Sequence, residues 1–256
     1  MTAPRTVVAE ASGPIADVQR RAGHESAHGG AVRTMFDRIA PTYDTLNHVL
    51  SAGLDVRWRS RAVAMLDDAP NGEVLDLCAG TLDLAAAIER AQPQRRVVAL
   101  DFAADMLERG RRKVTRTEVV VGDALDLPFA DRRFAAVVCG FGIRNLSNTG
   151  RGVAEAVRVL APGGFLVVLE FFRPAIGVAG MLTRAFHAGF ARAVLPLAGA
   201  AIARDRDAYA YLARSMESFL TRAEFEALLA AHGLSDVKGE DLTLGVASLV
   251  SARRRT

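Results

Sequence analysis

The segment VLDLCAGTLDLAAAI, residues 74–88, constrains the fold of this 256-residue chain more than any other. An apolar run with the pattern of a strand leads into a turn of small residues and then into a helical pattern. The next apolar run, RRVVALD, ends on Asp101, about 20 residues after Gly80. This order is typical of a parallel α/β sheet that binds a nucleoside at the carboxyl ends of its strands.

The turn between the first strand and its helix differs from a dinucleotide-binding loop, because no G-x-G-x-x-G motif can be written through residues 76–82. Gly80 allows the backbone to approach a ligand, and Asp101 offers an acceptor for ribose hydroxyls. Asp76 suits a ligand with an ammonium group, although it could instead only cap the strand end. These residues predict S-adenosyl-L-methionine as the cofactor, in contact with Asp76, Gly80 and Asp101.

Strand and helix patterns alternate through the middle of the chain, which indicates βαβ units and an α/β fold with an open parallel sheet. Strands are predicted at 73–77, 96–100, 119–121, 135–139 and 165–171, with a terminal pair at 235–242 and 245–252. Helices are predicted at 82–90, around 106–107, at 151–160, and from the capping box at 221–224 to Gly233. A turn at 161–164 is expected to introduce the fifth strand.

Three segments lie outside this alternation. Residues 1–30 lack hydrophobic periodicity and are predicted to form a mobile tail before a single domain, 31–256. Residues 31–70 have the pattern of two or three helices that form a lid. The insertion 174–218 carries apolar residues at three- and four-residue steps over 178–197, which indicates an amphipathic helix on the substrate side.

Composition excludes some classes of protein. The net charge is only +3, and the cationic residues form no clustered stripe with aromatics, so we expect no nucleic-acid partner. No uncharged apolar run reaches about 18 residues, so we expect no membrane span. Cys78 and Cys139 fall at predicted strand ends and suit reduced, buried residues of a cytoplasmic protein. No metal site is predicted.

Several blocks together resemble one family, the UbiE/MenG-type quinone-biosynthesis C-methyltransferases, which methylate polyprenylated hydroquinones in menaquinone and ubiquinone synthesis. The resemblance covers about residues 30–252, and its most specific motifs are F-x-x-x-A-x-x-Y-D at 36–44 and FGIRN at 141–145. The matching blocks are MFDRIAPTYDTLNHVLSAGLDVRWR, VLDLCAGTLDLA, GDALDLPFADRRFAAVVCGFGIRNL, VLAPGGFLVVLEFFRP, AYAYLARSMESF and LTLGVASLVSA.

The resemblance implies a Rossmann-like class I S-adenosylmethionine-dependent methyltransferase sheet of seven strands, the last antiparallel. By motif, Thr81 would contact the methionine end of the cofactor, and Asp101 would bind the ribose hydroxyls. Asp123 and Ala124 would bracket the adenine, although Asp123 could instead simply cap a turn. Gly140 would lie beside the cofactor at the end of the fourth strand.

The implied reaction places a methyl group on a ring carbon of the hydroquinone, so the site must favour the phenolate and accept the ring proton. Arg144 and Asn145 are predicted either to favour the phenolate or to hold a water that accepts the ring proton. Direct abstraction by Arg144 is not expected, because a guanidinium stays protonated and is a poor base. Tyr43 is predicted to close over the site. Alternatively, Arg144 could pair with a carboxylate such as Asp44, and Tyr43 could be an ordinary packing residue of the lid.

The chain departs from the family at Leu82, where relatives usually carry a second glycine. A leucine held at positive φ would be destabilised by about 1–2 kcal/mol. Either the loop is rearranged, or the glycine serves only close helix packing. The departure puts cofactor affinity in doubt more than the fold.

The predicted function is therefore C-methylation of a polyprenylated hydroquinone, with demethylmenaquinol as the favoured substrate over a benzoquinol. Two alternatives stay open: a methyltransferase for a small aromatic natural product, and a non-catalytic scaffold with the same fold. Arg184 and Arg192 flank the apolar stripe of the insertion, which suggests transient contact with a membrane surface. The same stripe could instead pack on the sheet or form a homodimer.

Overall fold

The computed structural model describes residues 48, 51, 53–174, 211 and 214–256. The predicted tail, Tyr43, Asp44 and the amphipathic stretch 178–197 lie outside the described residues, so the predictions made for them stay predictions. None of the helices in the described part of the chain is long and apolar enough to cross a membrane.

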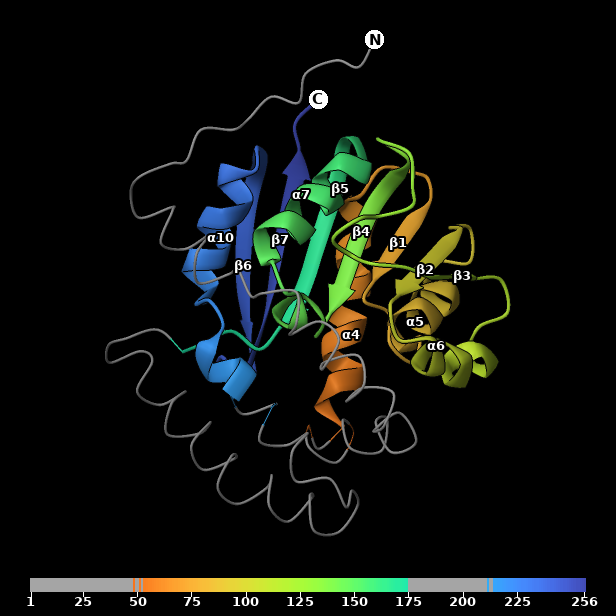
Figure 1. Cartoon of the computed structure of the whole chain (residues 1–256), viewed down its shortest axis with the longest axis horizontal. Coiled ribbons are helices and arrows are strands. Elements are labelled where there is room, and N and C mark those ends of the chain that lie inside the picture. Colours follow the sequence, from red (N-terminus) through yellow and green to blue (C-terminus); the bar gives the residue numbers. More distant parts are fainter. Residues whose placement is uncertain (1–47, 49–50, 52, 175–210, 212–213) are drawn as a thin grey trace.

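One seven-stranded sheet forms the centre of the fold, in the order β3-β2-β1-β4-β5-β7-β6 (Figure 1). Its strands are β1 (Val74–Leu77), β2 (Val97–Asp101), β3 (Glu118–Val121), β4 (Phe134–Gly140), β5 (Leu160–Glu170), β6 (Leu234–Leu242) and β7 (Ala247–Arg254). Neighbouring strands from β3 to β5 are parallel, whereas β7 runs antiparallel to both β5 and β6. The predicted sheet, with its last strand antiparallel, is confirmed.

Helices cover both faces of this sheet (Figure 1). They are α4 (Leu54–Ala64), α5 (Asp83–Ala91), α6 (Ala104–Gly110), α7 (Thr149–Val159) and α10 (Arg222–Ala231), with 3₁₀ turns η1 (Met65–Asp68), η2 (Arg111–Lys113) and η3 (Ile143–Asn145). The predicted helices of the sheet region are all present, with ends that differ by a few residues.

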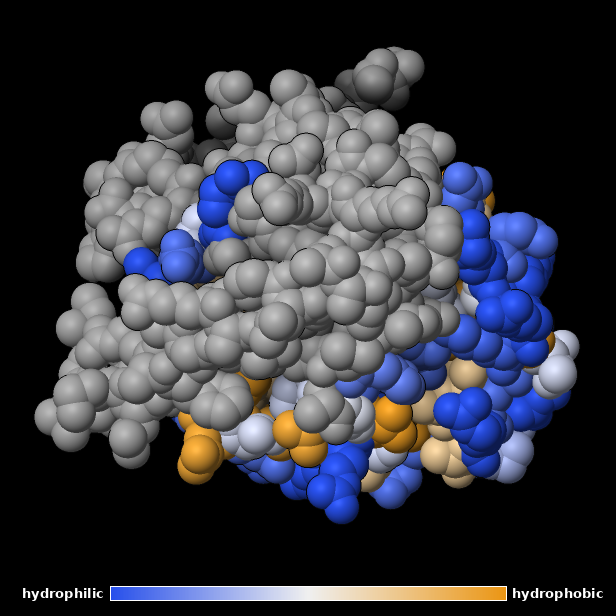
Figure 2. All heavy atoms as spheres, turned by 90° about the horizontal axis from the view of Figure 1, so that it is seen from below, coloured by the Kyte–Doolittle hydropathy of each residue, from blue (hydrophilic) through white to orange (hydrophobic). Residues whose placement is uncertain are grey.

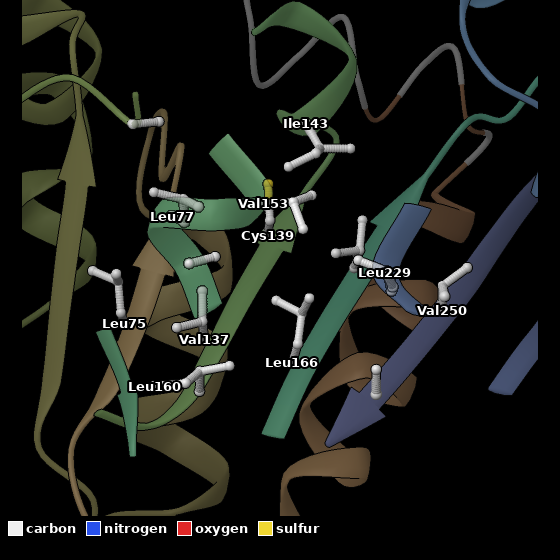
Figure 3. Close-up of a cluster of buried hydrophobic side chains, with 14 of the residues drawn as sticks. Leu75, Leu77, Val137, Cys139, Ile143, Val153, Leu160, Leu166, Leu229 and Val250 are labelled. Carbon is white, nitrogen blue, oxygen red and sulfur yellow. The ribbon is translucent and has the colours of Figure 1, made fainter. Parts of the chain in front are cut away.

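The core is divided between the two faces because side chains alternate along each strand. Leu75, Leu77 and Val137 belong to a cluster that includes residues of α7 and α10 (Figure 3). Their neighbours Val74 and Ala136 belong to a second cluster, which includes residues of α4 and α5. Strands β1 and β2 are therefore buried along their whole length, as expected for parallel strands covered on both sides.

The fifth strand differs from its prediction. β5 begins at Leu160 rather than at residue 165, and it contains the residues expected to form a turn. Phe134 pairs with Leu160 and Ala136 pairs with Phe165, so residues 161–164 bulge out of the ladder. The φ of Gly163 is +72°, which suits glycine and lets the strand continue after the bulge.

The C-terminal predictions are confirmed. At the start of α10 the Thr221 hydroxyl accepts a hydrogen bond from the Glu224 amide at 3.2 Å, and the Glu224 carboxylate accepts one from the Thr221 amide at 2.8 Å. This reciprocal pair is the capping box expected from the sequence. β6 and β7 form the predicted hairpin at one edge of the sheet.

The order of the strands creates a crevice. From β1 the chain continues to β2 and β3 on one side, whereas β4 lies on the other side of β1. Loops that leave the carboxyl ends of β1 and β4 therefore diverge, and α/β sheets bind ligands at such a point. Figure 2 views the molecule from the side of these carboxyl ends, and the described residues that are visible in it are mostly hydrophilic with a few apolar groups between them.

Candidate active site

A cavity of about 620 Å³ lies at the carboxyl ends of β1, β2, β3 and β4. Its volume is in the range of about 300–1,000 Å³ that small-molecule sites usually have. The predicted site residues that line it are Gly80, Asp101, Asp123, Ala124, Gly140 and Asn145. The topology thus brings together the ends of separate strands, as the sequence predicted.

Asp101 is the last residue of β2 and is buried. Its Oδ2 accepts a hydrogen bond from the Gly80 amide at 2.8 Å, and its Oδ1 accepts one from the Ala103 amide at 2.9 Å. These bonds fix the carboxylate between the turns that follow β1 and β2. Because each carboxylate oxygen can accept two hydrogen bonds, this group can also receive the hydroxyls of a ribose.

The backbone around the cavity is strained at three non-glycine residues. Cys78, Leu82 and Phe141 have φ values of 58°, 64° and 60°. Such left-handed conformations cost about 1–3 kcal/mol each and concentrate at functional sites. Gly80 also has positive φ, and a Cβ there would meet only the Met106 Cε, at 3.7 Å. The turn after β1 therefore leaves space for a ligand beside Gly80.

Leu82 precedes α5, and its side chain is fully buried. A Cβ on Gly110 would lie 2.8 Å from the Leu82 Cγ and 2.4 Å from the Thr81 carbonyl oxygen. The leucine side chain therefore packs against the end of α6, and it does not line the cavity. The loop keeps its left-handed turn without a glycine, and the isobutyl group leaves the ligand space open.

Asp76 and Thr81 are buried but do not line the cavity. The Asp76 Oδ2 accepts a hydrogen bond from the Ala85 amide at 2.9 Å, which caps the first turn of α5. Its Oδ1 has no hydrogen-bond partner among the described residues. Burial raises the pKa of Asp76 to about 8. The carboxyl group lies beneath the turn, and its contact with an ammonium group stays a prediction.

Asp123 and Ala124 follow β3 at the side of the cavity next to β2. The Asp123 Oδ1 accepts a hydrogen bond from the Leu125 amide at 2.8 Å, so this residue does cap a turn. Asp123 lines the cavity as well, so capping the turn does not exclude a contact with the adenine. Gly140 ends β4, and a Cβ there would lie 3.3 Å from Leu84 Cδ2.

Arg144 and Asn145 lie in η3, just after β4. Arg144 is buried, and its Nη1 donates to Glu170 Oε1 at 2.6 Å and to the Phe141 carbonyl oxygen at 2.9 Å. Asn145 lines the cavity, and its Oδ1 accepts a hydrogen bond from the Tyr211 hydroxyl at 3.1 Å. Arg144 therefore does form an ion pair with a carboxylate, which among the described residues is Glu170. Arg144 does not line the cavity, and its catalytic role stays a prediction.

Several residues of this region were not predicted from the sequence. Phe102 and Met106 line the cavity. In the sequence they follow a strand pattern, which indicates only that a helix begins there. Glu170 did carry a signal, because it is an acid at the end of β5 as Asp101 is at the end of β2. Tyr211 lies in the block AYAYLARSMESF that resembles the family, but nothing local in the sequence links it to Asn145.

The two cysteines are free, as predicted. Cys78 follows β1 and Cys139 lies in the neighbouring strand β4. A hydrogen bond to Cys139, together with burial, raises the pKa of the Cys78 thiol. A thiol in such surroundings is a poor nucleophile, so Cys78 is not a candidate for covalent chemistry.

Comparison with known proteins agrees with this geometry. The model of the ubiE/COQ5 methyltransferase family matches residues 23–254. Demethylmenaquinone methyltransferase of Thermus thermophilus is 46% identical over 84% of this chain and 97% of its own length. Ubiquinone/menaquinone biosynthesis C-methyltransferase UbiE of Geotalea daltonii is 37% identical over 88% of this chain and 97% of its own.

Solved structures confirm the fold. A SAM-dependent methyltransferase from Thermotoga maritima superposes with a TM-score of 0.63 at 17% identity, over 87% of this chain and 99% of that one. The family match covers most of the chain, and the strand-end residues Asp101 and Asp123 line the cavity. The chain therefore belongs to the ubiE/COQ5 methyltransferase family, and it is a methyltransferase that uses S-adenosylmethionine.

Proposed function

We propose that the enzyme methylates a ring carbon of a polyprenylated hydroquinone, with demethylmenaquinol as its substrate and menaquinol as its product. The name of the Thermus relative and its 46% identity support the naphthoquinol over a benzoquinol. The observation that carries the proposal is the pair Arg144–Asn145 after β4, in which Asn145 lines the cavity and the buried Arg144 is its neighbour in η3.

The cavity residues fit the cofactor. Asp101 would accept hydrogen bonds from the ribose hydroxyls, while Asp123 and Ala124 would bracket the adenine at the end of β3. The open space beside Gly80 would admit the methionine portion. When bound, S-adenosylmethionine supplies a methyl group for direct displacement, and the protein contributes alignment and exclusion of water.

Arg144 is suited to hold the acceptor as a phenolate. Its Nη1 is occupied by Glu170 and Phe141, and its Nε donates to the Ser215 hydroxyl at 3.4 Å. Its Nη2 has no hydrogen bond to the described residues. We infer that Nη2 donates to the phenolate oxygen of the acceptor, because a cation beside a phenol favours its ionised form.

The ring proton leaves after methyl transfer, and the protein must supply a route for it. Arg144 stays protonated and cannot accept it. Asn145 faces the cavity and can orient a water for this step, with Tyr43 as the residue proposed to close the site. The prenyl tail is proposed to lie along the stretch 178–197, which would meet a membrane surface transiently.

The test is methyl transfer by the purified enzyme, followed by mass spectrometry of the quinol. Reduced demethylmenaquinone should gain one methyl group, and the oxidised quinone should not. A strain that lacks the gene should accumulate a quinone lighter by one methyl group. Transfer to water-soluble phenols but not to the prenylated quinol would overturn the proposal.

A further inference from the structure

We propose that Glu170 and Tyr211 are positioning residues, which hold Arg144 and Asn145 in the orientation that methyl transfer needs. The inference rests on the proposed function and adds to it two residues that do not line the cavity. Both belong to segments distant from η3 in the sequence, and each contacts one member of the pair.

The Glu170 carboxylate binds both the main-chain amide and the side chain of Arg144. The Glu170 side chain is fully buried at the end of β5. Its Oε1 accepts a hydrogen bond from Arg144 Nη1 at 2.6 Å, and its Oε2 accepts one from the Arg144 amide at 3.3 Å. The Phe171 amide also donates to Oε1, at 2.8 Å. One carboxylate therefore ties both η3 and the guanidinium to the sheet.

Stability alone does not explain this buried ion pair. Burial raises the pKa of Glu170, and a buried ion pair is often no more stable than apolar side chains of similar volume. The carboxylate is surrounded by N–H donors on both oxygens, so its function in this place is to fix the donors. The guanidinium also lies over the Phe171 ring, 5.6 Å from the centroid, which limits its rotation.

The Phe141 carbonyl oxygen sets how the Asn145 amide is turned, and Tyr211 holds it in that orientation. The Phe141 carbonyl oxygen can only accept, and Asn145 Nδ2 donates to it at 3.4 Å. Asn145 Oδ1 must then face the opposite way, where the Tyr211 hydroxyl donates to it at 3.1 Å. The same Phe141 oxygen accepts from Arg144 Nη1, so one carbonyl links the two predicted catalytic side chains.

The experiment is a pair of double-mutant cycles on the purified enzyme. Glu170→Gln should lower kcat by about tenfold to a hundredfold, and Tyr211→Phe by less, because small displacements of aligned groups have large effects on rate. The dissociation constant of S-adenosylmethionine should stay within about twofold for both, since neither residue lines the cavity. Glu155→Gln is the control, because Glu155 forms an ion pair with Arg158 away from the site.

The cycles separate positioning from general damage. If Glu170 acts through Arg144, Glu170→Gln should reduce kcat no further in an Arg144→Met background, and Tyr211→Phe should reduce it no further in an Asn145→Ala background. If in both cycles the kcat of the double variant falls by the product of the two single losses, the inference is overturned. Full activity of both Glu170→Gln and Tyr211→Phe would also overturn it. Melting curves and cofactor binding show whether each variant is folded. If Arg144→Met does not fold, the Tyr211 cycle still tests the inference, because it uses only Tyr211→Phe and Asn145→Ala. If the wild-type enzyme binds the cofactor but methylates no quinol, the proposed function fails instead.

Discussion

Replacing Leu82 by glycine and by alanine tests whether the turn after β1 is strained. The side chain is fully buried, and φ is 64°. Leu82→Ala keeps the unfavourable φ and removes a buried isobutyl group, so it should lower the free energy of unfolding by about 2–5 kcal/mol. Leu82→Gly removes the same contacts but relieves a left-handed conformation that costs an L-residue about 1–2 kcal/mol.

The prediction is therefore an inverted order, with Leu82→Gly more stable than Leu82→Ala by about 1 kcal/mol. Inside a regular helix the order is the reverse, because glycine is less favourable than alanine by about 1 kcal/mol. Ala87→Gly, within α5, is the matched control and should be destabilising by about that amount. Urea denaturation of all four proteins gives these differences directly.

Cofactor binding provides a second measurement on the same variants. The Leu82 side chain packs toward Gly110 and does not line the cavity. Both Leu82 variants should then bind S-adenosylmethionine with the dissociation constant of the wild type, as long as they are folded. If alanine proves as stable as glycine at this position, the left-handed turn is not the conformation in solution, and the reasoning is refuted.

Three further predictions follow from the strand ends. Asp101→Ala should raise the dissociation constant of the cofactor at least about tenfold in calorimetry, because it removes the proposed ribose acceptor and leaves the Gly80 amide without its partner. Asp105 is exposed, so Asp105→Ala is the control and should leave this constant unchanged. Burial raises the pKa of Asp76 from its ordinary value of 3.8 to about 8. Between these two values the folded state keeps a proton that the unfolded state has released, so the free energy of unfolding falls as the pH rises from one to the other. Asp76→Asn should remove that fall, so its gain in melting temperature over the wild type should be larger at about pH 8 than at about pH 5; equal differences would contradict the assignment. Gly142→Ala should lower the melting temperature and weaken cofactor binding, because the new Cβ would lie 2.3 Å from the Cys78 Cβ; an unchanged melting curve would show that the turn can move.

Much of the fold was predictable because its signals are local. The continuous apolar runs of β1 and β2 and the capping box of α10 each depend on residues within one strand or one turn. Asp101 was predictable for the same reason, since an acid that ends a parallel strand must lie at the edge where the strands end together. β5 was the exception, because its bulge at 161–164 depends on pairing with β4, and a Gly-Gly pair looks the same in a bulge and in a turn.

The sequence by itself determined the sheet and the edge at which the cavity opens, and it predicted the strand-end residues that line this cavity. Only the tertiary structure decided that Arg144 pairs with Glu170 and that Tyr211 holds Asn145, because these contacts join strands and segments whose proximity depends on strand order. It also decided the direction of Leu82. The sequence shows that glycine is absent there, but only the packing of α6 shows where the leucine side chain goes and why the left-handed turn persists.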